Sequence, residues 1–180
     1  HSYYKLAPVF DIMVSSAVGD EALLSPQSIE ATKEDPGCVV FLKENSSVWK
    51  NTAKLDTLLG KASEFAGIFC VGGHGRAGFL EAGKVVSAVC HGPAALANVK
   101  LSNGTYLIAE QNFIGISDVE EDIIQFSRDM SFLLETELRE YGGIYEKAVG
   151  RFGVKVLTSG ENGKLYTGQN TSSSALQYLF

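Results

Sequence analysis

Apolar runs alternate with helical patterns along the 180-residue chain. Short runs of β-branched and small apolar residues predict strands at 8–16, 65–75 and 84–89. Two further strands are expected within 154–168, on either side of the turn Gly160-Glu161-Asn162-Gly163. The run 65–75 stops in glycines, as a fully buried parallel strand does.

Helix signals occupy the segments between these runs. Asp35 followed by Pro36 predicts an N-cap and a first-turn proline, which puts Cys38 on the packed face of a short helix. A free cysteine there behaves as a small hydrophobe, so Cys38 is interpreted as a core residue. Further helices are expected from about Pro93 and after Thr171.

The longest helical pattern follows residue 117. Ser117 and Glu120 form a capping-box pattern, and the apolar stripe behind them predicts one long helix that ends near Gly142. We interpret this helix as scaffold rather than as part of a site. The stripe consists of Val119, Ile123, Phe126, Met130, Leu133, Leu134 and Leu138.

Strands alternating with helices indicate an α/β sandwich around a mostly parallel sheet. The length fits one domain, spanning residues 1–180, that buries a substantial core.

Charge and hydropathy exclude several classes of partner. The 15 Lys and Arg against 21 Asp and Glu give a net charge of −6, which argues against nucleic acid because that affinity needs clustered cations. Apolar segments are too short to span a bilayer, and the first residues lack a secretory pattern. The three cysteines are widely spaced and do not resemble a disulfide framework. We expect a cytoplasmic protein that binds neither nucleic acid nor membrane.

Two predicted strands end in turns that can carry chemistry. One ends in Gly72-Gly73-His74-Gly75 and the other in Cys90-His91-Gly92-Pro93. Carboxyl ends of parallel strands meet at one edge of a sheet, where ligands gather. Small residues around Cys90 allow a sharp strand-to-helix turn like the nucleophile elbow of hydrolases. The following helix dipole would lower the pKa of this thiol and maintain a thiolate.

The same residues also allow purely structural interpretations. A lone cysteine is more often packing, which we expect for Cys70, but His91 and the glycines favour chemistry at Cys90. His74 either contacts substrate or caps its glycine turn. A zinc site of Cys90, His91 and His74 is disfavoured because adjacent ligands chelate one metal poorly. No metal or organic cofactor is expected.

The segments AVCHGPAAL, VGGHG, GISDVEED and YTGQN together resemble the ThiJ/PfpI superfamily, in particular its glyoxalase III and heat-shock chaperone branch. The resemblance covers the whole chain. It implies a flavodoxin-like three-layer sandwich of the class I glutamine amidotransferase type, a homodimer and a reactive cysteine. It further implies a glyoxalase III-like lyase of the D-lactate dehydratase type, converting methylglyoxal to lactate without glutathione.

Carried over residue by residue, the resemblance makes Cys90 the nucleophile and His91 a general acid/base. The amides of Gly73 and His91 would face the oxygen of a small 2-oxoaldehyde substrate, with His74 as a candidate substrate contact. Stress chaperone, deglycase and redox-sensor functions remain alternatives. A glutamine amidotransferase or papain-like protease is excluded, because no histidine follows His91.

Two features depart from the family pattern. Relatives carry a glutamate ahead of a histidine that corresponds to His1, and this glutamate and the strand before it are absent here. The segment between Arg76 and Glu81 is also shorter than in relatives. Loss of a central strand would expose unpaired backbone groups. The sequence is then either a naturally trimmed, inactive member or the ordered pieces of a longer chain joined together, and the exposed backbone groups favour the second.

Overall fold

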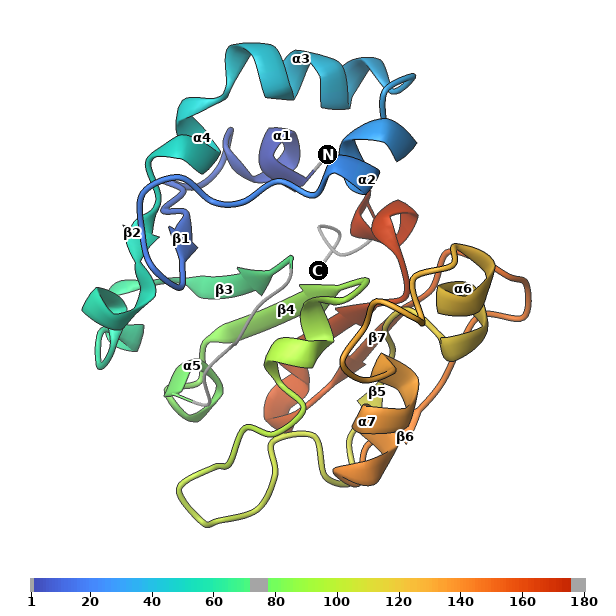
Figure 1. Cartoon of the computed structure of the whole chain (residues 1–180). Helices are drawn as coiled ribbons and strands as arrows, with labels where there is room; N and C mark the ends of the chain where they lie inside the picture. Colours follow the sequence, from blue (N-terminus) through green and yellow to red (C-terminus); the bar gives the residue numbers. More distant parts are fainter. Residues whose placement is uncertain (1, 72–77, 176–180) are drawn as a thin grey trace. The chain divides into compact units, whose positions relative to one another are not determined.

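The corner predicted at Cys90 lies on a four-stranded sheet in the second of two compact units (Figure 1). The computed structural model describes residues 2–71 and 78–175. Its two units are His1–Leu59 and Gly60–Phe180. The single domain expected over 1–180 remains a prediction.

The first unit contains short helices and one two-residue parallel strand pair. The Asp35 carboxylate accepts hydrogen bonds from the backbone N–H groups of Gly37 and Cys38, which confirms the predicted cap. Cys38 itself is half-buried, so its prediction as a core residue was wrong. The elements are α1 (Ser2–Leu6), β1 (Ser15–Ser16), α2 (Pro26–Ala31), α3 (Pro36–Glu44), α4 (Ser47–Lys50), β2 (Ala53–Lys54) and the 3₁₀ helix η1 (Leu55–Leu58).

The strand predicted at 8–16 is mostly irregular. In this segment Ser15 and Ser16 alone pair with β2, and the preceding apolar side chains Val9, Phe10 and Met13 are exposed. Without a partner ladder, apolar composition does not hold a segment in a sheet.

The second unit is built around the sheet β3-β4-β8-β7. β4 pairs in parallel with both β3 and β8, and β7 adds an antiparallel edge. The strand predictions at 84–89 and 154–168 are confirmed. The elements are η2 (Ala62–Glu64), β3 (Gly67–Cys70), α5 (Gly78–Glu81), β4 (Val85–Val89), η3 (Gly92–Ala95), β5 (Asn112–Phe113), α6 (Asp118–Ile123), α7 (Leu134–Glu140), β6 (Ile144–Tyr145), β7 (Val156–Ser159), η4 (Glu161–Gly163), β8 (Leu165–Gly168) and η5 (Thr171–Ala175).

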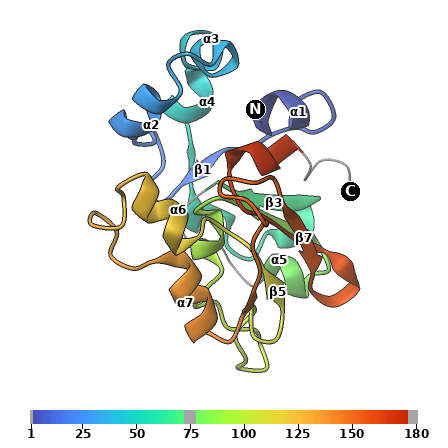
Figure 2. The same cartoon turned by 90° about the vertical axis from the view of Figure 1, so that its right-hand side faces the viewer.

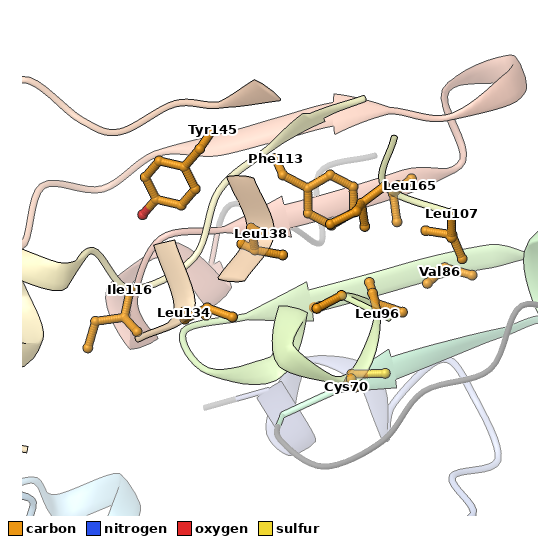
Figure 3. Close-up of a cluster of buried hydrophobic side chains, with 14 residues drawn as sticks. Cys70, Val86, Leu96, Leu107, Phe113, Ile116, Leu134, Leu138, Tyr145 and Leu165 are labelled. Atoms are coloured by element: carbon orange, nitrogen blue, oxygen red, sulfur yellow. The ribbon is translucent and has the colours of Figure 1, made fainter. Parts of the chain in front are cut away.

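The core of this unit lies against the middle of the sheet (Figure 3). Val86 and Leu165, partners across β4 and β8, are fully buried. Leu134 and Leu138 bring one face of α7 onto the same cluster. Burying each such side chain contributes about 2 kcal/mol, so this cluster anchors the strand ends that carry the site.

The single long helix predicted from residue 118 is wrong. The segment forms two separate short helices, α6 and α7, joined by a loop (Figure 2). Gln125 adopts a positive φ of 61° just after α6, which no α-helix accommodates. Val119 and Ile123 of the apolar stripe are 46% and 44% exposed. The capping box of Ser117 and Glu120 is confirmed.

The helix expected from Pro93 is the four-residue 3₁₀ helix η3, and the one expected after Thr171 begins as the 3₁₀ helix η5. The remaining predictions for fold class hold. The molecule is a mixed α/β protein with mostly parallel pairing, consistent with a flavodoxin-like fold. Among the described residues, no helix has the length and apolar character needed to cross a bilayer.

Candidate functional site

Cys90 occupies a sharp corner directly after β4. Its φ is +59°, a left-handed conformation that costs a residue with a Cβ about 1–2 kcal/mol. Two backbone hydrogen bonds hold it there. The Cys90 N–H donates to the Gly168 carbonyl at 3.0 Å, and the Cys90 carbonyl accepts from the Ile116 N–H at 3.0 Å. The strand-to-helix elbow predicted from the sequence is therefore present.

Gly92 lies against the end of the neighbouring strand β3. A Cβ at position 92 would lie 2.0 Å from the Cys70 carbonyl oxygen, so any other residue would collide with backbone. The close packing of the corner on β3 is therefore one physical reason for a glycine at this position.

His91 lies between the thiol and a buried carboxylate. Its Nδ1 is 3.4 Å from the Cys90 Sγ, and its Nε2 is 2.5 Å from Oε1 of Glu121. A carboxylate oxygen can only accept, so Nε2 carries the hydrogen and the Nδ1 lone pair faces the thiol. The order Cys90–His91–Glu121 places an acceptor beside the sulfur.

Glu121 is the residue of this group that sequence reasoning missed. Its side chain is fully buried on α6, and its second oxygen, Oε2, has no hydrogen-bond partner among the described residues. The interpretation of this segment as scaffold alone is therefore wrong. A signal was present in the sequence, because the capping box accounts for Glu120 and leaves the adjacent Glu121 without a role.

Glu120 faces a different set of partners. Its Oε2 accepts from the backbone N–H and hydroxyl of Ser117, and its Oε1 accepts from the Phe152 N–H and the Gln169 amide. Four donors satisfy this buried carboxylate. Glu120 fastens loops together, whereas Glu121 orients an imidazole.

The thiol of Cys90 is not a standing thiolate. Burial raises its pKa to about 11, the His91 backbone N–H lowers it in part, and the charges of Glu121 and Glu120 raise it again. The expected depression of the pKa is therefore wrong. The four-residue η3 has a weak dipole, and two buried carboxylates lie near the sulfur. The resting group is a thiol beside the acceptor Nδ1 of His91.

The other two predicted site residues, Gly73 and His74, lie outside the described residues. Cys70 is 7% exposed within β3, which agrees with its interpretation as packing. Within residues 2–71 and 78–175, no three His, Cys, Asp or Glu side chains are arranged to hold a metal ion.

The two best-formed hollows found among the described residues are not lined by Cys90 or His91. One, of about 320 Å³, lies in the first unit beside Tyr3 and Asn51. The other, of about 120 Å³, lies in the second unit between Glu120 and Arg151. Both hollows are therefore separate from the predicted pair.

No family model and no curated protein sequence matches the chain. Solved structures do match it. The structure of APC35852 is 30% identical, with a TM-score of 0.78 over 99% of this chain and 82% of the other. The Rapid Encystment Protein 24 kDa (REP24) of Francisella tularensis is 28% identical, with a TM-score of 0.81 over 100% and 87%. Glyoxalase III (Orf 19.251) from Candida albicans is 21% identical, with a TM-score of 0.74 over 99% and 82%.

The chain belongs to the ThiJ/PfpI superfamily. This ThiJ/PfpI protein has the α/β fold of the class I glutamine amidotransferase-like proteins, as the motifs around Cys90 predicted. The likeness to the Candida glyoxalase is a likeness of fold. The chemistry of this ThiJ/PfpI protein depends on its own side chains, because one fold carries many functions.

Proposed function

We propose that this ThiJ/PfpI protein is a glutathione-independent glyoxalase that converts methylglyoxal to lactate at Cys90. The observation that supports the proposal best is the order Cys90–His91–Glu121, with the ring nitrogens 3.4 Å from the sulfur and 2.5 Å from the carboxylate. Nucleophile, base and orienting group are the parts that covalent catalysis by a thiol needs. The shared fold with a glyoxalase III adds support.

The first step forms a bond between sulfur and carbon. The Cys90 thiol gives its proton to Nδ1 of His91 as Sγ attacks the aldehyde carbon, and the carbonyl π electrons move to oxygen. The imidazolium then protonates this alkoxide, which leaves a hemithioacetal and a neutral ring. Glu121 stabilises the transient imidazolium through Nε2–H.

The second step moves hydrogen between neighbouring carbons. His91 removes the proton from the carbon that bears sulfur, and an enediolate forms with its negative charge on the former ketone oxygen. The imidazolium returns that proton to the former ketone carbon. The proton of the hydroxyl on the sulfur-bearing carbon moves to the former ketone oxygen, which gives a thioester carbonyl beside a secondary alcohol. One carbon is oxidised and its neighbour reduced, so no external oxidant or reductant is needed. Water then cleaves the thioester, releasing lactate and the thiol.

The test uses the purified chain with methylglyoxal and no glutathione, following loss of aldehyde and formation of lactate. We expect Cys90→Ala to lower turnover by at least about 10³-fold, because the nucleophile is lost. Cys70→Ala, the matched control at the neighbouring strand end, should keep kcat within about two-fold, since small apolar swaps leave the fold intact.

The alternatives give different results in the same samples. Turnover that persists in Cys90→Ala would contradict the proposed mechanism. Suppression of aggregation that survives Cys90→Ala, with no turnover by the parent protein, would indicate a chaperone instead. Addition of two oxygens to Cys90 by mild peroxide, again without turnover, would indicate a redox sensor.

A further inference from the structure

We infer that Tyr145 is a positioning residue for Cys90, acting through the backbone segment 114–116; the link to turnover rests on the proposed function. The Tyr145 hydroxyl donates a 2.7 Å hydrogen bond to the Gly115 carbonyl. The next residue, Ile116, donates its N–H to the Cys90 carbonyl at 3.0 Å. One peptide unit therefore connects the tyrosine to the elbow.

The segment 114–116 has little freedom to relax. At its other end, the Ile114 N–H donates to the Thr167 hydroxyl at 3.2 Å. All three residues of the segment are buried. A Cβ at Gly115 would lie 2.8 Å from Leu134 Cδ2 and 3.0 Å from the Cys90 carbonyl oxygen, so the segment packs directly against the elbow. A close-packed segment transmits a displacement rather than absorbing it.

The surroundings of Tyr145 keep its hydroxyl protonated, so it can donate a hydrogen bond. It is 6% exposed and lies at the border of the buried cluster, where Figure 3 shows its hydroxyl oxygen. Burial raises the pKa of its phenol, so the hydroxyl stays protonated through the range of protein stability. Arg139 lies over the ring, with its guanidinium carbon 5.2 Å from the centroid. Arg139 thus covers one face of the ring while the hydroxyl reaches Gly115.

Loss of this hydroxyl leaves the buried Gly115 carbonyl without the donor described here. The peptide between Gly115 and Ile116 is then held less firmly, and because the packed segment passes its displacement on, the hydrogen bond from Ile116 to the Cys90 carbonyl weakens. Cys90 holds its φ of +59° against an intrinsic preference for negative values. A looser elbow shifts Sγ relative to Nδ1 of His91, and proton transfer over such a contact depends steeply on geometry.

The experiment compares Tyr145→Phe with Tyr141→Phe. Tyr141 is the matched control because it is half-buried near the same turn and its ring packs edge-on against Tyr106. Its hydroxyl makes no hydrogen bond to the elbow within residues 2–71 and 78–175. For Tyr145→Phe we expect kcat to fall about five-fold, in line with one lost hydrogen bond, with KM within about two-fold. Tyr141→Phe should leave both constants unchanged.

A second measurement does not depend on turnover. Alkylation of Cys90 by iodoacetamide, followed at the peptide level by mass spectrometry, should change in rate and in pH midpoint for Tyr145→Phe and not for Tyr141→Phe. Thr167→Val, which removes the other anchor of segment 114–116, should change the same two quantities. Lower stability of Tyr145→Phe with unchanged alkylation and kcat would overturn the inference. If the parent protein has no glyoxalase turnover, the alkylation result still decides the inference.

Discussion

The ends of the neighbouring strands β3 and β4 each carry a cysteine, and the two cysteines differ in backbone more than in acidity. Burial raises the pKa of both Cys70 and Cys90 to about 11. Cys70 lies within the ladder, in register with Ala88. Cys90 lies one residue beyond its strand, at φ +59° and 3.4 Å from His91. The two thiols therefore have the same pKa in the folded chain, and they differ in that Cys90 lies beside the base His91.

The comparison shows what a parallel sheet edge adds to a thiol. Inside the ladder, the side chain of Cys70 packs in the core and its carbonyl serves as a surface for Gly92. Beyond the ladder, the turn exposes Cys90 to groups from distant segments, including Glu121 on α6 through His91. Reactive groups therefore gather just past the carboxyl ends of strands.

The largest effect should come from a substitution that makes the two strand ends clash. Gly92→Ala places a methyl group at 2.0 Å from the Cys70 carbonyl oxygen. We expect the free energy of unfolding to fall by about 3 kcal/mol or more, because neither backbone can yield. Denaturant unfolding measures this loss.

The matched control for this change is Gly150→Ala. A Cβ at Gly150 meets nothing within 4 Å, so its stability should change by less than about 0.5 kcal/mol. Equal stability of the two variants would contradict the close packing of the corner on β3.

A second prediction separates the two buried carboxylates. Glu121→Gln keeps the size of the side chain but removes the charge that stabilises the His91 imidazolium, so kcat should fall about 100-fold. Glu120→Gln should instead lower stability, because an amide replaces an oxygen that accepts hydrogen bonds. Steady-state kinetics and thermal unfolding of both variants measure the difference. An equal loss of kcat in both variants would contradict the assignment of Glu120 to loop structure and of Glu121 to the His91 imidazole.

The third and smallest effect is a pH dependence of stability, which follows from the raised pKa of the buried Cys70 thiol. The pKa of Cys70 is about 11 in the folded chain against an ordinary 9.0, so between these values the unfolded chain releases a proton that the folded chain retains. Stability then falls as pH rises, by about 2 kcal/mol near pH 10.5 for this thiol. Chemical denaturation across this range should show a flatter profile in Cys70→Ala. An unchanged profile would mean that the Cys70 thiol ionises in the folded chain.

The sequence predicted the elbow because its determinants are local. An apolar run that stops at Cys-His-Gly-Pro predicts that a strand ends there, and the small residues around the cysteine predict a tight turn. The cap at Asp35 and the hairpin of β7 and β8 were predictable for the same reason, since a few adjacent residues fix each one.

What the sequence could not show depends on tertiary contacts. The pattern from Val119 to Leu138 has helical spacing and contains no glycine or proline, so nothing local marks the break after α6. The role of Glu121 depends on an imidazole 30 positions away. The high pKa of Cys90 likewise depends on burial by residues that only the folded chain assembles.

The contact between Gly92 and the Cys70 carbonyl forms only when β3 and β4 pair in the native register, so the geometry of the site depends on that register. β3 and β4 pair in a register that sets Cys70 opposite Ala88, and a slip of one residue would turn every β3 side chain to the opposite face. The same slip would move the Cys70 carbonyl out of its close contact with Gly92. The elbow can reach its native form only after this alignment and the distant pairing with β8 are complete. Reactivity at residue 90 should therefore emerge late in folding, as a signal of correct assembly.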